Sequence, residues 1–350
     1  MNTFGNRFRF TSFGESHGAA VGGVVDGCPG GISLDMALIE EDLEHRKPTA
    51  SWSTARHEAD QVEFLSGLYN GKTLGSPIAF ILRNTDCRTA DYNDIADIYR
   101  PGHADHTYEA RYGIRAVNGG GRASARETAA RVVAGSIAKM LIRPRGIQIH
   151  AYTSQIGTVC LNVPDAEVDY SRIYQEPTRC PDHKTSKEME ALLDEVRKNE
   201  DSVGGAVTCV ISGLPAGLGN PIFGKVQSLL AAAMMSINAC KGFEYGTGFA
   251  SAVMHGSELN DPYAKDAAGH ISPLSNRAGG LLGGITNGHD IIFRCAFKPT
   301  PSIGRAQRTC DADGVMQQLR IRGRHDTCVV PRAVSVVEAM AAMVIADLTL

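Results

Sequence analysis

The sequence lacks the features of a secreted or membrane-spanning protein. Its nine cysteines are an odd number and include no Cys-x-x-Cys pair, so a disulfide framework is not expected and a reducing cytoplasm is favoured. Residues 1–10 contain no apolar signal core. The most apolar stretch, residues 333–350, contains Glu338 and Asp347, which favours a core or interface helix over a membrane span.

A charge excess is also missing. The formal net charge is −3, which excludes a bulk electrostatic footprint for nucleic acid. Of the 35 basic residues, however, 25 are arginines and 10 are lysines. Because the planar guanidinium matches carboxylate and phosphate oxygens in pairs, arginines set among glycines indicate an anionic ligand. Arginines elsewhere could serve solubility alone.

The fingerprint of a dinucleotide-binding fold is absent, because no Gly-x-Gly-x-x-Gly follows a strand and opens a helix. Strand candidates occur in groups with Gly-rich returns, which favours an α+β fold of antiparallel sheets packed on helices. The length suits one large domain or two ordinary ones. Apolar periodicity predicts helices over 35–46, 124–143, 186–199, 221–240 and 333–350, and strands over 62–65, 77–82, 206–211, 252–254 and 290–296.

Two stretches of the chain resemble each other. Residues 22–41 and 206–231 each contain a strand candidate, a Gly-x-Pro-x-Gly turn and a helix candidate. Each half also ends in a loop rich in glycine and arginine before an apolar helix, at 119–143 and 323–350. We therefore infer pseudo-duplicated halves, although this turn is common enough to recur by chance.

The most informative stretch is residues 119–128, Gly-Gly-Gly-Arg-Ala-Ser-Ala-Arg-Glu-Thr. Ser124 is followed three residues later by Glu127, which predicts a capping box at a helix start. A helix N-terminus carries free N–H groups and partial positive charge, so anions bind there. Arg126 would oppose the helix dipole, which suits the binding of an anion better than stability. The alternative is simple capping.

Two motifs contain histidine between small or charged residues. In residues 13–19, Ser16 and His17 lie between glycines, and histidine suits proton transfer near neutral pH; a structural histidine in a tight turn is the alternative. In residues 100–106, His103 and two neighbours could bind a metal. Spacings this short seldom converge on one ion, so we favour anion binding by the arginine and general acid catalysis by His103.

Three further segments suggest binding of a charged ligand. Residues 320–332 contain four arginines around Asp326, which should stay ionised as an orienting group or weak base; a solvated loop is the alternative. Residues 275–284 are glycine-rich and could approach a flat ligand closely. Residues 298–302 offer a cation and two hydroxyls, which suit a phosphate group.

Together these motifs resemble the chorismate synthase family. Seven occur in the family's order over residues 4–350: Gly-Glu-Ser-His-Gly, Arg-Pro-Gly-His-Ala-Asp, Gly-Gly-Gly-Arg-x-Ser-Ala-Arg-Glu-Thr, Ser-Ile-Asn-Ala-x-Lys-Gly, Ala-Gly-Gly-x-Leu-Gly-Gly-Ile, Lys-Pro-Thr-Pro-Ser and Gly-Arg-His-Asp. The resemblance implies a lyase of the shikimate pathway that forms chorismate and phosphate from 5-enolpyruvylshikimate 3-phosphate. The reaction is an anti-1,4-elimination that needs reduced FMN without net redox change.

The resemblance also implies one catalytic domain over 1–350, built as a helical layer between antiparallel sheets, and a cytoplasmic homotetramer. The implied catalytic residues are His17 as the acid beside the leaving phosphate, His103 as proton donor to the flavin, and Asp326 as acceptor of the substrate proton. The implied substrate-binding residues are Ser16, Arg46, Arg100, Arg126, Arg324 and Arg332. The implied flavin-binding residues are Arg122, Ala123, Ser124, Asn238, Ala239, Gly283, Lys298, Pro299, Thr300, Pro301, Ser302 and Arg324.

The sequence departs from the family at two places. Many members carry a second arginine soon after the one matching Arg46, whereas here none occurs before Arg56. Many members have tyrosine where this chain has His106, which makes His106 a weak catalytic candidate. No NADP-binding fingerprint is present, so we expect an external flavin reductase to supply the reduced FMN.

Two other functions remain open at this point. A metal-dependent phosphate-ester hydrolase could use His103, Asp105 and His106, and it would need a stoichiometric ion. A non-catalytic anion-binding protein would show no turnover to lose. The family resemblance favours the lyase, with no metal, nucleic acid or membrane as partner.

Overall fold

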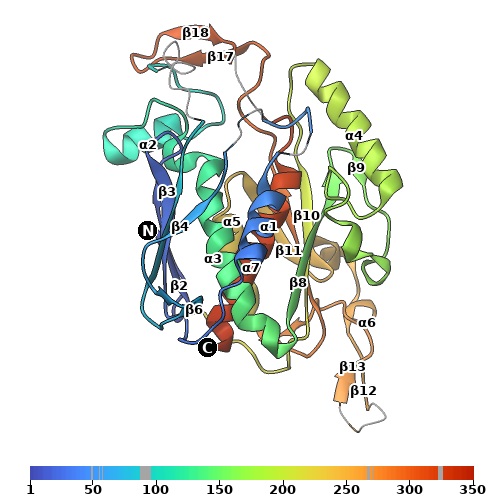
Figure 1. The fold of residues 1–350 in the computed structure, drawn as a ribbon. Coiled ribbons are helices and arrows are strands. Elements are labelled where there is room, and N and C mark those ends of the chain that lie inside the picture. The colour runs from blue at the N-terminus through green and yellow to red at the C-terminus, as the bar shows by residue number, and fades with distance from the viewer. Residues whose placement is uncertain are drawn as a thin grey trace.

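The computed structural model describes residues 1–48, 50–54, 56, 58–86, 96–265, 269, 271–321 and 326–350. Two five-stranded antiparallel sheets enclose a layer of helices (Figure 1). The first sheet has the order β1 (Thr3–Phe4), β2 (Arg9–Gly14), β3 (Ala20–Asp26), β7 (Ile78–Arg83), β4 (Val62–Phe64). The second has the order β11 (Cys240–Tyr245), β16 (Ile291–Phe297), β10 (Gly205–Ser212), β8 (Gln148–Ile156), β9 (Val159–Cys160). The observed α+β class agrees with the sequence analysis.

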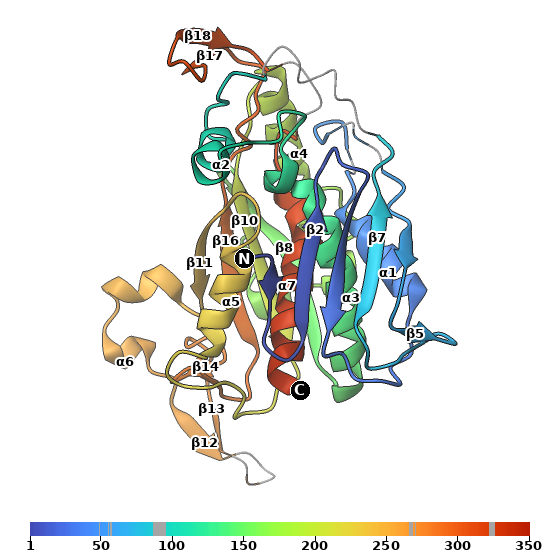
Figure 2. The ribbon, with the colours of Figure 1, turned by 90° about the vertical axis from the view of Figure 1, so that its left-hand side faces the viewer.

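The enclosed helices are α1 (Met36–Arg46), α3 (Thr128–Ile142) and α7 (Val330–Thr349), and α5 (Val226–Met235) packs on α7 and β11. Figure 2 shows, from a second side, α3 and α7 behind the first sheet. Smaller elements decorate this core. They are α2 (Asp105–Tyr112), α4 (His183–Lys198), α6 (Gly256–Leu259) and the hairpins β5–β6 (68–69, 72–73), β12–β13 (263–265, 271–273), β14–β15 (281–282, 285–286) and β17–β18 (307–310, 316–319).

Most predicted elements are confirmed. Helix α1 follows the predicted cap, Asp35, whose side chain accepts a hydrogen bond from Leu38 N at 3.1 Å. The predictions for 186–199 and 333–350 correspond to α4 and α7, each of which begins three residues earlier. Four of the five predicted strands correspond to β4, β7, β10 and β16.

The predicted capping box is wrong in its details. The chain first makes a 3₁₀ turn, η3 (Ala125–Glu127), and α3 begins only afterwards. The Ser124 hydroxyl caps Arg126 N at 3.3 Å. The Glu127 carboxylate pairs instead with Arg131, one helical turn ahead, at 3.0 Å, so it does not complete the capping box.

Two other predictions are wrong. The helix expected over 221–240 is shortened to α5, because Ala239 adopts a left-handed φ of 67° and the chain from Cys240 joins the second sheet. Residues 252–254 are not a strand but lie at the end of the 3₁₀ segment η7 (Gly248–Val253). Periodicity also missed β2 and β8, whereas β3 contains the strand candidate found in residues 22–41.

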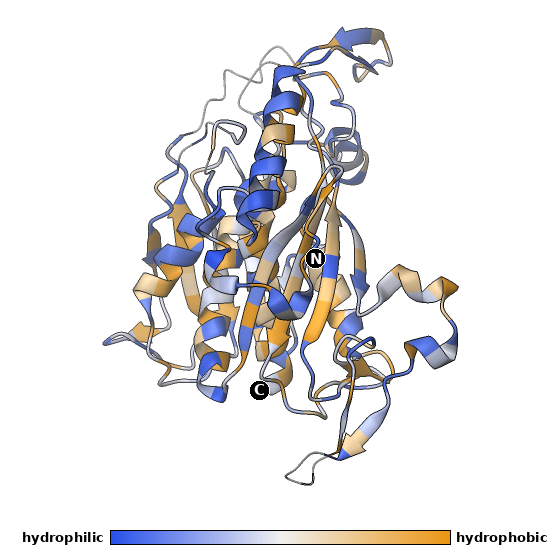
Figure 3. Cartoon of the chain, turned by 90° about the vertical axis from the view of Figure 1, so that its right-hand side faces the viewer, coloured by the Kyte–Doolittle hydropathy of each residue, from blue (hydrophilic) through white to orange (hydrophobic). Residues whose placement is uncertain are grey.

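The helical layer is packed closely. Every residue of α3 except Arg131 is buried. A Cβ added to Gly135 would lie 2.3 Å from the Cβ of Ala339 on α7, so only glycine lets the two helices approach this closely. Apolar colour concentrates in the strands and the helices that face them (Figure 3). Among the described residues, no helix is long and apolar enough to cross a membrane.

A buried ion cluster ties the three central helices together. Lys139 Nζ on α3 lies 2.8 Å from Asp42 Oδ1 on α1 and 3.1 Å from Glu338 Oε2 on α7. Glu338 Oε1 also accepts a hydrogen bond from Ala151 N of β8 at 2.9 Å. Burial alone would lower the pKa of Lys139, but the two carboxylates outweigh it and raise this pKa. The cluster therefore fixes how the helices sit relative to one another.

Replacing the cation of this cluster should destabilise the protein strongly. Lys139→Ala leaves Asp42 and Glu338 buried with no counter-charge, so we expect a loss of ~3–5 kcal/mol in the free energy of unfolding. The measurement is chemical denaturation. The matched control is Lys187→Ala, which breaks an exposed pair with Glu190 and should cost less than about 1 kcal/mol. Equal losses in the two variants would contradict the structural role of the cluster.

Candidate active site

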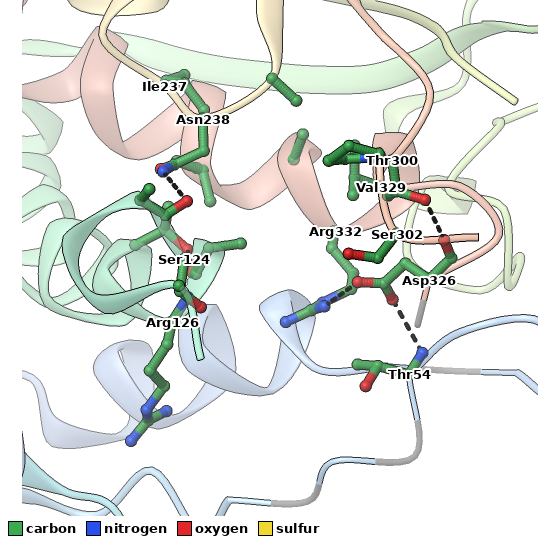
Figure 4. A pocket seen from close by; sticks show the side chains of 18 of the residues that line it. Thr54, Ser124, Arg126, Ile237, Asn238, Thr300, Ser302, Asp326, Val329 and Arg332 are labelled. Carbon is green, nitrogen blue, oxygen red and sulfur yellow. Dashed lines mark hydrogen bonds and ion pairs between the residues drawn. The ribbon is translucent and has the colours of Figure 1, made fainter. Parts of the chain in front are cut away.

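A cavity of about 540 Å³ lies where one end of the helical layer meets the long loops. The last turn of α1, the turn before α3 and the first turn of α7 contribute Arg46, Arg126 and Arg332 to its wall. Asn238 and Ser124 lie on one side in Figure 4, and Thr300, Ser302 and Asp326 lie on the other. The cavity therefore collects side chains from segments that are far apart in the sequence.

Asp60 holds two of these arginines side by side. Its Oδ2 lies 2.6 Å from Arg46 Nη2, and its Oδ1 pairs with Arg126 Nη1. Arg126 also donates to Asn84 Oδ1 at 2.8 Å and to Arg83 O at 3.2 Å. Arg46 Nε is buried without a hydrogen-bond partner among the described residues, and Arg46 lines the cavity.

The charges around Asp60 keep it ionised. Burial alone would raise the pKa of Asp60, but the positive charges of Arg46 and Arg126 outweigh it and hold this pKa below its usual value. Burial lowers the pKa of Arg46 to about 10, which still leaves it charged at neutral pH. The group of three therefore carries a net charge of one positive unit.

Asp326 occupies the opposite wall. Its Oδ2 lies 2.6 Å from Arg332 Nη1, and its Oδ1 accepts a hydrogen bond from Thr54 N at 2.9 Å (Figure 4). Its backbone carbonyl accepts a hydrogen bond from Thr300 Oγ1 at 2.7 Å. Arg332 Nε also donates to Arg46 O at 3.3 Å. The carboxylate of Asp326 is thus held at the cavity wall from both sides.

His17 and His103 both line the cavity, and each is held through Nδ1. His17 Nδ1 lies 2.9 Å from Ser16 Oγ. His103 Nδ1 lies 3.0 Å from Asp105 Oδ1. In both residues Nε2 is the ring nitrogen left to face other groups.

Gly119 links the two histidine segments. It adopts a φ of +92°, and a Cβ built on it would lie 2.3 Å from His17 Nδ1. Its carbonyl accepts a hydrogen bond from Arg100 Nη2 at 3.2 Å. Only glycine tolerates both the positive φ and the close approach of the His17 ring. This explains why the first residue of the Gly-Gly-Gly run is glycine.

One wall has the chemistry to hold a flat phosphorylated cofactor. Asn238 Nδ2 donates to Ala123 O at 2.9 Å, while its buried Oδ1 has no hydrogen-bond partner among the described residues. A Cβ on Gly120 would come within 3.3 Å of His103 Nε2, so this surface is open only because glycine stands there. Lys298 and Ser302 add a cation and a hydroxyl nearby. An unused amide oxygen, a glycine surface and a cation fit the ring and phosphate of FMN.

The structure brings together most of the residues predicted for the site. The predicted residues that line the cavity are His17, Arg46, Arg100, His103, Ala123, Ser124, Arg126, Asn238, Ala239, Lys298, Thr300, Pro301, Ser302, Asp326 and Arg332.

The other predicted residues lie elsewhere. Ser16 is buried behind His17, and Arg122 turns to strand β2, where it donates to Ser12 Oγ at 2.9 Å. Pro299 is not among the lining residues, and Gly283 lies in the turn between β14 and β15. Arg324 lies outside the described residues.

Sequence reasoning missed several lining residues. Asp60 was not identified, because its meaning depends on Arg126, 66 residues away. Arg56 lines the cavity and donates to Glu58 Oε1 at 2.6 Å and to Ser16 O at 2.8 Å. It thus supplies a cation from the segment in which the expected second arginine is missing. The signal in the sequence that could have identified Arg56 was its position close to that segment.

The histidines of residues 103–106 do not form a metal site. His106 packs edge-on against Tyr99, with ring centroids 5.3 Å apart. Both oxygens of Asp105 accept hydrogen bonds from Arg100, at 2.6 and 2.8 Å. Within the described ranges, no group of three or more His, Cys, Asp or Glu side chains could hold a metal ion.

Comparison with known proteins identifies the family. The sequence model of chorismate synthase matches residues 8–350. The chain belongs to the chorismate synthase family. The chorismate synthase of Porphyromonas gingivalis is 55% identical over 350 residues, covering 99% of this chain and 95% of that protein. The chorismate synthase of Azobacteroides pseudotrichonymphae is 53% identical over 348 residues, covering 99% and 98%.

A solved structure supports the same assignment. A crystal structure of chorismate synthase superposes with a TM-score of 0.77 at 30% sequence identity, covering 98% of this chain and 91% of that one. The mixed α+β fold of this chain is therefore that of a chorismate synthase.

Asp60 should contribute to stability in a pH-dependent way. Because its pKa is lower in the folded protein, its contribution is complete above the ordinary value of about 3.9 and is lost as pH falls through the lower folded value. Asp60→Asn should therefore lower the free energy of unfolding at pH 7 by ~3–5 kcal/mol, with a difference from wild type that shrinks in acid.

Denaturation curves across pH measure this difference. The matched control is Glu63→Gln, which breaks an exposed pair with Arg83 and should change stability little, because water screens such pairs. If the wild type and the Asp60→Asn variant differed by a constant amount down to strong acid, the assigned ionisation would be contradicted.

Proposed function

We propose that this chain converts 5-enolpyruvylshikimate 3-phosphate to chorismate and phosphate by anti-1,4-elimination in the shikimate pathway. The observation that carries the proposal is a single cavity lined by both histidine motifs, Asp326 and a surplus of arginine. The substrate carries two carboxylates and a phosphate, so a cation-rich wall matches its charge. Preorganised cations also stabilise the charge that develops on a leaving phosphate.

The substrate is held by the arginines at the helix ends. Arg46, Arg126 and Arg332 come from three different helices, so they can contact separate anionic groups of one ligand. Arg46 is a candidate for direct contact because it lines the cavity at the end of α1. Arg324 remains a candidate from the family resemblance.

His17, Asp326 and His103 divide the proton transfers. His17 donates a proton to the leaving phosphate, which departs with the electron pair of the broken C–O bond. Asp326 accepts the C6 proton of the substrate, and the C–H electron pair becomes part of the new double bond. His103 is the proposed proton donor on the cofactor side of the cavity, with Nδ1 held by Asp105.

Reduced FMN, when bound, lends electron density to the substrate and recovers it, so no net oxidation occurs. Ala123, Ser124, Asn238, Ala239, Lys298 and residues 300–302 would hold it, because the unused amide oxygen lies on one side of the cavity and the hydroxyls of Thr300 and Ser302 lie on the other. Burial and the charge of Lys241 lower the pKa of Lys298, which marks a pair of cations suited to a phosphate group. An external flavin reductase is the proposed source of the reduced cofactor.

We also propose a cytoplasmic homotetramer of single-domain subunits. Several large apolar side chains are exposed on peripheral segments, among them Phe223 at 94%, Phe249 at 80% and Ile271 at 76%. Such exposure in a monomer favours burial against other copies.

The two halves are proposed to be pseudo-duplicated. The order β2-β3-β7-β4 in the first sheet is repeated as β8-β10-β16-β11 in the second, with the same antiparallel pairing. Helix α1 follows β3 as α5 follows β10, and α3 ends the first half as α7 ends the second. This repetition supports the duplication inferred from the two Gly-x-Pro-x-Gly turns.

Removing either histidine should abolish most turnover while the fold is kept. His17→Ala and His103→Ala should each lower kcat ~10²–10⁴-fold, the usual contribution of general acid catalysis. The assay is anaerobic, with 5-enolpyruvylshikimate 3-phosphate and photoreduced FMN, and follows chorismate absorbance. His106→Ala, which alters a contact with Tyr99 outside the cavity, is the matched control and should retain activity. Wild-type-like turnover in both test variants would refute the assignment.

A further inference from the structure

We infer that Asp105 is a positioning residue that fixes His103 as the Nδ1–H tautomer, and that Arg100 orients the carboxylate of Asp105. The inference rests on the proposed role of His103 and deepens it. It gives Arg100, which the family resemblance implies to be a substrate contact, a second role in holding Asp105. It also gives Asp105 a role in the reaction.

Asp105 is enclosed by donors. Its side chain is buried, at 4% exposure, and its Oδ2 accepts from Arg100 N at 3.0 Å and from Arg100 Nε at 2.8 Å. Its Oδ1 accepts from Arg100 Nη2 at 2.6 Å, and Arg115 Nη1 lies 3.6 Å away. Burial alone would raise the pKa of Asp105, but the hydrogen bonds from Arg100 and His103 outweigh it and hold this pKa far below its usual value.

The hydrogens of Arg100 determine the tautomer of His103. Nη2 carries two hydrogens, and it has two oxygen acceptors, Asp105 Oδ1 at 2.6 Å and Gly119 O at 3.2 Å. The 3.1 Å contact between Nη2 and His103 Nδ1 is therefore a contact between two donors. His103 Nδ1 also lies 3.0 Å from Asp105 Oδ1. Two lone pairs at that distance would repel, so Nδ1 carries the hydrogen and donates it to the carboxylate.

This tautomer leaves Nε2 as the functional atom. Nε2 lies against Gly120, where an added Cβ would come within 3.3 Å, on the cofactor side of the cavity. Because Asp105 holds the Nδ1 hydrogen, a second proton taken up by the ring lies on Nε2, from which it can be donated. His17 differs, because its Nδ1 meets the uncharged hydroxyl of Ser16. The two histidines are thus prepared for different proton transfers.

The same contacts account for the spacing of the Arg-Pro-Gly-His-Ala-Asp motif. The chain turns at Gly102, with φ of +71°, and His103 N donates to Arg100 O at 3.1 Å. Asp105 then begins α2, so its carboxylate lies in the first helical turn, where negative charge is favoured. Arginine, histidine and aspartate therefore meet within six residues.

Asp105→Asn gives the sharpest test, because asparagine places an amide oxygen at one of the two carboxylate oxygen positions and an NH₂ group at the other. Arg100 makes three of the four short hydrogen bonds to the carboxylate, two of them to Oδ2. The amide oxygen should therefore stay at the Oδ2 position and turn the NH₂ group toward His103 Nδ1. His103 would then accept at Nδ1 and move its hydrogen to Nε2.

The measurement is long-range ¹H–¹⁵N NMR on histidine-labelled protein, with His103 assigned by the loss of its signals in His103→Gln. Neutral His103 should be Nδ1–H in wild type and Nε2–H in Asp105→Asn, and kcat should fall on the order of 10²-fold or more with KM changed little. Glu109→Gln, which removes a charge from the same helix and contacts Arg115 at 3.2 Å, should leave both unchanged.

Two results would overturn the inference: an Nε2–H tautomer in the wild type, or an Asp105→Asn protein with wild-type tautomer and kcat. The wild-type spectrum alone decides the matter if the variant does not fold. The proposed function fails separately, since full turnover by His103→Ala would refute the role of His103 while leaving its measured tautomer intact.

Discussion

The buried contact of Lys139 with Asp42 and Glu338 is the constraint on which the site depends. It joins α1, α3 and α7 inside a largely apolar layer. The ends of these helices lie at the cavity, and the last turn of α1, the turn before α3 and the first turn of α7 each contribute an arginine to its lining. A shift of one helix along another would separate these arginines, so the ion cluster in the core sets the geometry of the anion site. Removal of one partner from such a cluster is costly, which opposes any such shift.

Within the cavity, acidic side chains hold the basic ones in place. Asp60 lies between Arg46 and Arg126, Glu58 pairs with Arg56, and Asp326 pairs with Arg332. Basic side chains still outnumber acidic ones, because the three carboxylates share the cavity lining with further lysines and arginines. An anionic substrate therefore meets cations whose positions are already fixed, which limits the ordering cost of binding. The two histidines are held in a similar way, because a neighbouring residue on the same turn orients each ring through Nδ1.

Local sequence predicted the parts of the fold that depend on nearby residues. Asp35 capping α1 and the apolar stretch of α7 are examples, and most of the motif residues did gather in one cavity. Features that depend on distant partners could not be predicted. The helix expected over 221–240 ends early because its last residues turn toward Ala123 and enter a sheet. Asp60 has no local motif, and Ser124 and Glu127 have capping-box spacing but make other contacts.

The central claim is that substrate and cofactor bind together in this one cavity. A crystal structure of the protein with FMN and 5-enolpyruvylshikimate 3-phosphate tests it most directly. The account predicts the flavin against Asn238, Ser124 and Thr300, and the substrate anions against Arg46 and its neighbouring arginines, with His17 Nε2 near the phosphate. Clear density for either ligand outside the cavity, with the cavity itself empty, would contradict the account.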